Sequence, residues 1–439
     1  MLKNEHADKH RLTVVVLLMA VMVISVLDKS IFAFAGVQII NELKLTPEQF
    51  GLVGSAFYFL YSVSGVSVGF IANRMPSRLV LIGMSLAWML AQMLTALSSG
   101  FAALMASRML LGAGCGPGTA VTLHACFKWY APRERILPSA LIQVAIMIGA
   151  ICGALSLPWI IEHVGWRTAY MTLAGIGLLW LTIWLIWGRE GCYDDNLKVE
   201  ANIAFSHHIP YRRLLLDRTF FFVTVASFCC YLPTALVYSW VPVYLQKGLG
   251  LAPIQSGYVV MVCTLGIISL SLGMSALSQR AMKRGASMRR AMVVTPLVAT
   301  AIGGAALIVI GLSGNSLKVI LILYIVGGVL VNLLPIYSNS LVAFITPDSQ
   351  RGSMLATHTG LITTAGMIGP HLVGKAISWH GGDISRGFEL TIALFGIAIV
   401  ASALLGLRHI DPEKSLLKLA PYRSTPQHEA VETAPSSVT

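Results

Sequence analysis

The stretch "GFIANRMPSR", residues 69–78, joins two long apolar segments and places two arginines in one short turn. The segments on either side, 51–72 and 79–98, have the length that an α-helix needs to cross a bilayer, about 20 residues. The same arrangement returns in the second half of the chain, where Arg280 and Arg284 follow another apolar segment. A repeat of spans and basic turns is typical of a membrane protein built from two related helical bundles.

The composition of the whole chain agrees with a protein of many membrane spans. Of its 439 residues, 56% are hydrophobic and only 11% are charged, so its apolar surface exceeds what one soluble core can bury. We predict an all-α membrane protein with two pseudo-symmetric six-helix bundles. Its twelve transmembrane helices are expected at 12–36, 51–72, 79–98, 101–126, 137–161, 169–187, 219–246, 255–279, 289–312, 317–345, 352–378 and 388–408.

The basic residues predict the orientation of these spans. Most of the 31 lysines and arginines lie in loops on one side, which also holds both termini. The positive-inside rule therefore predicts cytoplasmic termini, in a multi-pass protein of the bacterial inner membrane. The predicted domains are an N-terminal bundle at 1–188, a cytoplasmic linker at 189–218, a C-terminal bundle at 219–410 and a disordered cytoplasmic tail at 411–439.

Other classes of protein lack support in the sequence. The formal net charge of +12 is spread over short clusters between the spans, so membrane topology explains it better than a nucleic-acid partner. The seven cysteines show no CxxC or Cys/His spacing, and we expect neither a metal nor a cofactor. A P-loop, a catalytic triad and paired catalytic carboxylates are also absent from the sequence, which predicts that the protein is not an enzyme.

Two motifs resemble those of a known superfamily. "GFIANRMPSR" is similar to the loop signature of the major facilitator superfamily, and "RMLLGAG", residues 108–114, is similar to its helix-4 arginine motif. Within the superfamily the chain resembles the anion:cation symporter family, which includes hexuronate, D-galactonate and phthalate permeases and sialin. The stretches that carry this likeness are "LDKS", "SAFYFLY", "GWR", "YSWVPVYL" and "MIGPHLVG". The resemblance implies a monomeric transporter that moves a small organic anion with protons by alternating access.

The chain departs from the pattern of this family at three positions. The family usually has Arg where Lys29 stands, Asp where Asn73 stands and, in many members, Glu where Cys115 stands. That Glu takes part in proton coupling in the galactonate-type members, so their proton path is incomplete here. In the family the Arg contacts the substrate carboxylate. A lysine ammonium lacks the two-pronged guanidinium geometry, so we expect less directional recognition.

Charged residues inside the predicted spans mark the candidate site. An ionised side chain in hydrocarbon costs several kcal/mol, so such residues normally face a cavity and find partners. Asp28 lies about 24 Å along its helix, and Arg108 lies about 10 Å from the other surface. In a core about 30 Å thick these depths coincide, so we expect the two side chains to meet in one cavity.

Lys29 is the candidate for binding the anion. Adjacent residues on a helix point about 100° apart, which leaves Lys29 free to face the substrate. Together with Asp28 and Arg108 it leaves one net positive charge, which suits a monovalent anion. In the alternative interpretation, Asp28 and Arg108 form a structural ion pair while Lys29 extends to the periplasmic surface.

Asp28 is also the predicted proton carrier, because burial and nearby cations act in opposite directions on a carboxyl group. His358 is a second titratable candidate, or else a hydrogen-bonded packing residue. The loop signature is expected to control the inward gate, with arginines that pair with helix C-termini or with acids of the other half. Its gating residues are Gly69, Asn73, Arg74 and Arg78.

Four further residues are predicted to bind substrate. The family resemblance implies that Tyr61 and Thr359 face it. Trp240 and Tyr244 lie one turn apart on a predicted helix and are placed to pack on an aromatic or short aliphatic acid, unless they serve as interfacial belt aromatics.

The sequence as a whole favours a bacterial symporter that takes up a small organic anion with protons, with its site between the two halves. Two alternatives stay open. An exporter or exchanger would use the same fold without an obligatory proton. A non-transporting membrane sensor would bind the ligand and signal through the loop at 189–218.

Overall fold

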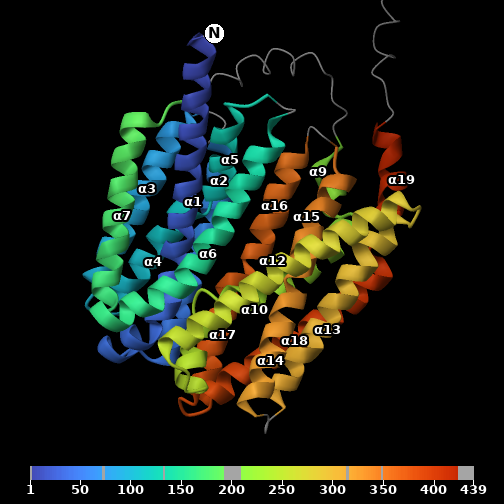
Figure 1. The fold of residues 1–439 in the computed structure, drawn as a ribbon. Coiled ribbons are helices and arrows are strands. Elements are labelled where there is room, and N and C mark those ends of the chain that lie inside the picture. The colour runs from blue at the N-terminus through green and yellow to red at the C-terminus, as the bar shows by residue number, and fades with distance from the viewer. Residues whose placement is uncertain are drawn as a thin grey trace, which may run out of the picture.

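The structure of the protein is a computed structural model that describes residues 2–71, 75–131, 134–191, 209–312, 316–347 and 350–423. These ranges are helical almost throughout and contain no strand (Figure 1).

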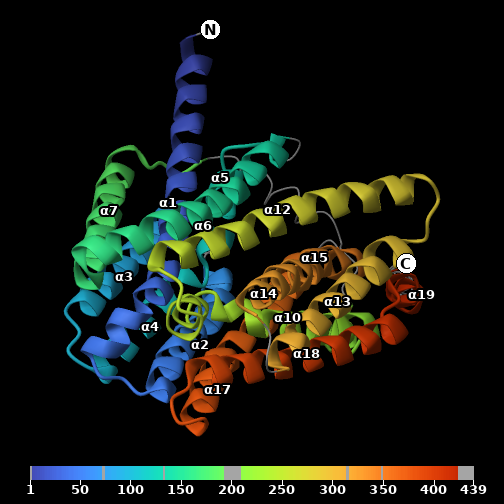
Figure 2. The same ribbon diagram turned by 60° about the horizontal axis from the view of Figure 1, so that its bottom comes forward.

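The helices form two groups that lie side by side (Figure 2). The N-terminal group consists of α1 (Leu2–Glu42), α2 (Pro47–Ile71), α3 (Ser77–Ala96), α4 (Phe101–Cys115), α5 (Gly118–Phe127), α6 (Ile136–Val164) and α7 (Trp166–Trp187).

The C-terminal group follows a short helix, α9 (Tyr211–Leu215). The longer helices of the C-terminal group are α10 (Arg218–Leu236), α12 (Pro253–Lys283), α13 (Thr295–Gly311), α14 (Leu317–Val331), α15 (Leu333–Ile345), α16 (Arg351–Thr363), α17 (Ala365–Trp379) and α18 (Ile384–His409). Short helical turns are α11 (Val241–Val243) and two π-helical turns at Tyr244–Gly248 and Arg290–Val294. A last helix, α19 (Pro412–Arg423), follows α18.

Helices occupy all twelve predicted spans, and the described residues contain ten helical segments that are long and apolar enough to cross a membrane. The two remaining spans, predicted as continuous at 101–126 and 352–378, are each broken into two helices. The first break falls at Gly116 and Pro117, where proline lacks the N–H that continues a helix and its ring clashes with the preceding turn.

The structure adds detail to the predicted linker and tail. The linker residues 192–208 lie outside the described residues, but Ile209 is held by two hydrogen bonds to Gln350, of 2.9 and 2.7 Å. The tail predicted as disordered begins as α19. The Ser415 hydroxyl on this helix bonds to Asp217 at 2.9 Å and to Thr219 at 2.8 Å, and these anchors explain why it is ordered.

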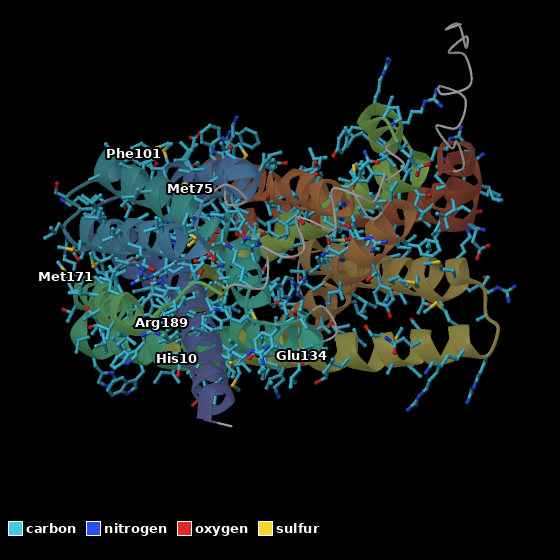
Figure 3. The ribbon with its side chains drawn as sticks, turned by 90° about the horizontal axis from the view of Figure 1, so that it is seen from above. His10, Met75, Phe101, Glu134, Met171 and Arg189 are labelled. Atoms are coloured by element: carbon cyan, nitrogen blue, oxygen red, sulfur yellow. The ribbon has the colours of Figure 1, made fainter. Side chains whose placement is uncertain are left out.

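The start of α1 and the last helix, α19, lie at the same end of the molecule (Figure 1), which Figure 3 shows from above. We call this the terminal end and the other the opposite end. Their common location agrees with the even number of predicted spans.

Direct contacts between the two groups close the opposite end. An added Cβ at Gly51 of α2 would lie 2.5 Å from the carbonyl oxygen of Pro370, and one at Gly374 of α17 would lie 2.4 Å from that of Pro47, so these backbones touch. Glycines at these positions permit the approach. Hydrogen bonds that cross between the groups are Lys247 to Asn41, the His371 N–H to Ser55, Tyr58 to the Ala235 carbonyl, and Ser62 with Thr363.

Close packing of α2 on α4 positions the candidate site. A Cβ at Gly112 would lie 2.0 Å from the carbonyl oxygen of Phe57, and one at Gly116 would lie 2.2 Å from that of Tyr61. The two glycines are one turn apart, Gly112 in α4 and Gly116 directly after it, and both meet α2. Only residues without a side chain allow this distance, which brings Arg108 against Phe57.

Candidate functional site

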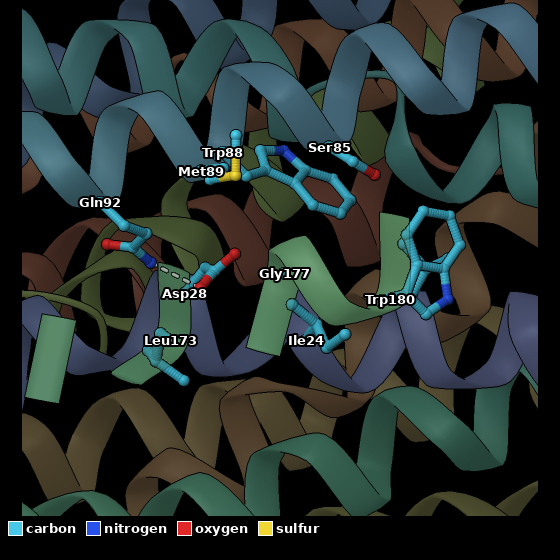
Figure 4. A pocket seen from close by; sticks show the side chains of 10 residues that line it. Ile24, Asp28, Ser85, Trp88, Met89, Gln92, Leu173, Gly177 and Trp180 are labelled. Atoms are coloured by element: carbon cyan, nitrogen blue, oxygen red, sulfur yellow. Dashed lines mark hydrogen bonds between the residues drawn. The ribbon is translucent and has the colours of Figure 1, made fainter. Parts of the chain in front are cut away.

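Asp28 faces the interior of the N-terminal group. Its side chain is 2% exposed, and a carboxylate oxygen accepts a hydrogen bond of 2.5 Å from the side-chain amide of Gln92 on α3 (Figure 4). Gln92 is itself fully buried. The carboxylate therefore points between α1 and α3, away from the C-terminal group.

A small cavity adjoins this carboxylate, between α1, α3 and α7 (Figure 4). Its volume is about 10 Å³, enough for one water molecule at most. Apolar side chains such as Leu173 and Trp180 form much of its wall. The hydroxyl of Ser85 and the amide oxygen of Gln92 also belong to lining residues, and neither has a hydrogen-bond partner among the residues that the structure describes. The cavity is therefore narrow, and these two polar atoms at its edge make no hydrogen bond within the described residues.

Lys29 faces the other side of α1. Its ammonium lies 5.9 Å from the ring centroid of Tyr61 on α2 and is within electrostatic range of Tyr61, Cys115, Tyr238 and the neighbouring Asp28. Lys29 is half-buried and, among the residues that the structure describes, has no carboxylate within 4 Å. Within the described residues, Lys29 is therefore a cation without an ion-pair partner, on the side of α1 that faces Tyr61.

Arg108 does not pair with Asp28, so the predicted meeting of these two side chains is wrong. The guanidinium carbon lies 4.4 Å from the ring centroid of Phe32 and 4.8 Å from that of Phe57. The side chain is 1% exposed, and in the described part of the chain its Nε and Nη1 atoms have no hydrogen-bond partner. The two side chains do not meet because they point in different directions. Gln92 donates a hydrogen bond to the Asp28 carboxylate, while the rings of Phe32 and Phe57 pack on the Arg108 guanidinium.

Aromatic side chains surround the space next to Lys29. Tyr58 and Tyr61 lie on α2, and Tyr231 on α10 contributes from the C-terminal group, with its ring centroid 6.0 Å from that of Tyr58. Phe57 packs on Tyr61 with centroids 5.4 Å apart. The environment of the unpaired ammonium is therefore apolar and aromatic, with tyrosine hydroxyls as its polar groups.

Trp240 and Tyr244 are both buried. Trp240 is completely buried, donates its indole N–H to the carbonyl of Pro370 at 2.9 Å and packs its edge on Phe50. Tyr244 is 1% exposed, stacks on Phe388 and donates its hydroxyl to Glu389 at 2.9 Å. Both side chains are packed against neighbours within the structure, and their predicted role in binding substrate stays a prediction.

The two predicted residues of α16 point in different directions. His358 is buried within the C-terminal group, and its ring nitrogens each lie 2.9 Å from a hydroxyl, those of Thr224 and Ser338. This placement favours the packing interpretation of His358. Thr359 is exposed, one turn before Thr363, whose hydroxyl contacts Ser62 of α2 at 2.9 Å.

Of the four predicted gating residues, the structure places one in detail. Gly69 lies in α2, whereas Asn73 and Arg74 fall outside the described residues. Arg78 donates to the carbonyl of Leu185 at the end of α7, and its backbone N–H donates to Glu190. It does pair with a helix C-terminus, but with one of its own group rather than of the other half.

Glu190 accepts several hydrogen bonds at the terminal end, next to Arg78. It accepts hydrogen bonds from Lys128 after α5, from the Ser77 hydroxyl and from the backbone N–H groups of Ser77 and Arg78. Burial raises the pKa of the Glu190 carboxyl, but these hydrogen bonds outweigh burial and hold the pKa below its ordinary value. The residue ties α3, α5 and α7 together.

Sequence reasoning missed Gln92 and the tyrosines of the C-terminal group. Gln92 had a usable signal, because an amide in the middle of an apolar span needs a polar partner. Tyr231 and Tyr238 had none, since their approach to Tyr58 and Lys29 depends on how the two groups pack.

Similarity to known proteins identifies the family of this chain. The model of the Major Facilitator Superfamily matches residues 18–293. The chain belongs to this superfamily. It is therefore a multi-pass membrane transporter and not an enzyme.

Individual relatives extend the likeness over nearly the full length. The chain is 27% identical to a hexuronate transporter of Bacillus subtilis, over 92% of this chain and 96% of the relative. It is 26% identical to a probable sulfoacetate transporter of Cupriavidus necator, over 86% and 90%. Among solved structures it is similar to a bacterial homologue of the human lysosomal transporter Spinster, with a TM-score of 0.74, 16% identity and coverage of 95% and 99%. These relatives confirm the resemblance to anion transporters of the superfamily.

Proposed function

We propose that the protein takes up a small organic anion together with protons by alternating access, as a monomer in a bacterial inner membrane with cytoplasmic termini. The observation that carries this proposal is the ammonium of Lys29, which lies unpaired where the two groups meet. Relatives named for hexuronate and sulfoacetate transport support an anionic substrate.

The surroundings of Lys29 define the class of anion. A single unpaired ammonium suits one carboxylate or sulfonate group. Tyr61 and Tyr58 offer ring surface and hydroxyl groups to the rest of the solute, while Arg108 adds positive charge behind Phe57. We therefore propose a monovalent acid with an apolar or aromatic body, with Thr359 contributing from α16.

Asp28 is proposed as the proton site. Its side chain points about 100° away from that of Lys29, toward Gln92, so proton and anion would act on the same helix from two directions. The closed opposite end supports a step in which the solute leaves through the terminal end. Protonation of Asp28 would loosen its bond to Gln92, and α1 would transmit this change to Lys29.

Exchange of anions is the second candidate. Cys115 stands where many family members have a proton-coupling Glu, and both nitrogens of His358 are engaged in hydrogen bonds. Asp28 is then the one proposed proton site among the described residues of the candidate site. A transporter of this kind would retain exchange even without a proton gradient.

A thermal-shift screen followed by transport tests the proposal. Purified protein is screened against glucuronate, sulfoacetate, benzoate and butyrate, and the acid with the largest shift is used in proteoliposomes. We expect Lys29→Gln to abolish both the shift and uptake, and Lys29→Arg to retain them. Lys318→Gln, an exposed cation of the opposite end, is the control. Undiminished uptake by Lys29→Gln would overturn the anion site.

A further inference from the structure

A second cavity lies at the terminal end of the C-terminal group. Its volume is about 120 Å³, and it is formed where the start of α10, the end of α18 and α19 converge. One water needs about 10–15 Å³ of such space, so the cavity has room for a larger polar group.

Positive charge dominates this cavity. The cationic residues that line it are Arg218, Arg289, Arg408, Lys414 and Lys418, and its acids are Asp217 and Asp411. We call this set the basic pocket.

Both acids of the basic pocket are already engaged. Asp217 caps α10 by accepting from the N–H groups of Thr219 and Phe220, and also accepts from Ser415. Asp411 pairs with Lys414 at 3.1 Å. Asp411 also lies within electrostatic range of Arg289, but two carboxylates cannot balance the five cations of the pocket.

Three of the cations have no partner of their own. Arg289 donates to the carbonyls of Leu407 and Ile410 and so caps α18. By contrast, Arg218, Arg408 and Lys418 have neither a hydrogen bond nor an ion pair in the part of the chain that the structure describes. Side chains on three separate helices thus offer donors to one space.

We propose that the basic pocket binds the phosphoryl group of an anionic phospholipid. Arginine and lysine are the side chains that bind phosphate oxygens, and basic pockets between helices at a membrane surface hold anionic headgroups. Asp217 already satisfies the first N–H groups of α10, so the side chains rather than the helix terminus bind the phosphate.

The surface beside the pocket favours a lipid over free phosphate. Leu404 and Leu405 lie one turn before Arg408 and His409 on α18, and are 58% and 48% exposed. They offer an apolar track for acyl chains that continues from the pocket toward the membrane. A headgroup in the pocket and chains along α18 would join α10, α18 and α19, and stabilise the C-terminal group.

The test is the melting temperature of the full-length purified protein in detergent, with and without added lipid. Phosphatidylglycerol is expected to raise it, while phosphatidylcholine at the same concentration leaves it unchanged. The double variant Arg408→Gln/Lys418→Gln should lose at least half of the shift. Lys283→Gln/Arg290→Gln, which removes two cations of the same end outside the pocket, should keep it.

Two further measurements distinguish a lipid headgroup from free phosphate and control for misfolding of the variants. Inorganic phosphate is expected to give a much smaller shift than the lipid; an equal shift would assign the pocket to free phosphate and overturn the lipid. The charge-retaining variant Arg408→Lys/Lys418→Arg should recover the wild-type response. A shift that is the same for phosphatidylcholine, or unchanged in the Gln double variant, would overturn the proposal.

Discussion

Asp28 and Lys29 are adjacent on α1 but belong to different environments. The carboxylate is held by Gln92 inside the N-terminal group, while the ammonium lies beside Tyr61 where the two groups meet. One helix therefore carries a buried acid on one face and an unpaired cation on the other. The proposed coupling of protons to anions depends on this division.

Gln92→Leu tests the environment of Asp28. The change removes the hydrogen-bond partner of a buried carboxylate, and we expect it to destabilise the protein by about 1–3 kcal/mol. The same change in an Asp28→Asn background should cost less, because no charge is then left unpaired. Melting temperatures of the four proteins of this cycle provide the measurement. Equal costs in both backgrounds would mean that the bond to Asp28 contributes nothing.

Gly112→Ala tests the contact of α2 with α4. The new Cβ would lie 2.0 Å from the Phe57 carbonyl oxygen, so the helices must separate, at a cost of about 1–3 kcal/mol. Substrate affinity should fall as well, because Lys29 and Tyr61 move apart. Gly83→Ala on α3 is the matched control, since a Cβ there meets nothing within 4 Å. Equal behaviour of the two variants would contradict the close packing.

Glu190 predicts a pH dependence at the terminal end. Burial raises its pKa, but hydrogen bonds from Lys128, Ser77 and Arg78 lower the pKa by more, so it lies below its ordinary value. A carboxyl with a depressed folded-state pKa stabilises the protein fully above its unfolded pKa, and this contribution is lost as pH falls through the folded-state pKa. Glu190→Gln should therefore be less stable than wild type at pH 7.

The measurement is the melting temperature of both proteins from pH 8 to pH 3.5. Their difference should stay constant down to about pH 5 and shrink below the ordinary glutamate pKa of about 4.3. Glu162→Gln, at an exposed residue near the end of α6, should show little difference at any pH. A difference between Glu190→Gln and wild type that grows as pH falls would reverse the assigned sign.

The sequence predicts depth better than direction. Counting residues along a helix predicts similar depths for Asp28 and Arg108, but it does not predict which way their side chains point. The direction of each side chain depends on its neighbours, Gln92 for the acid and Phe32 and Phe57 for the arginine. Those neighbours come from other helices, so the expected pair could not be rejected from the sequence.

The ends of helices and the order of the tail show a similar limit of prediction from the sequence. Pro117 signals the end of α4, although its span was predicted as continuous. The order of α19 depends on Ser415, whose partners lie almost 200 residues earlier in the chain. Trp240 and Tyr244 lie one turn apart in the sequence, which is the spacing that predicted a pair packed on the substrate. Both side chains are buried in the structure.

Transport by two single variants in proteoliposomes tests the central claim most directly. Accumulation driven by a pH gradient and exchange driven by substrate on the far side are measured for Asp28→Asn and Lys29→Gln, with the acid that gives the largest thermal shift. The division of roles on α1 predicts that Asp28→Asn loses accumulation but keeps exchange, and that Lys29→Gln loses both. Gradient-driven accumulation by Asp28→Asn at the wild-type level, or exchange by Lys29→Gln at that level, would contradict it.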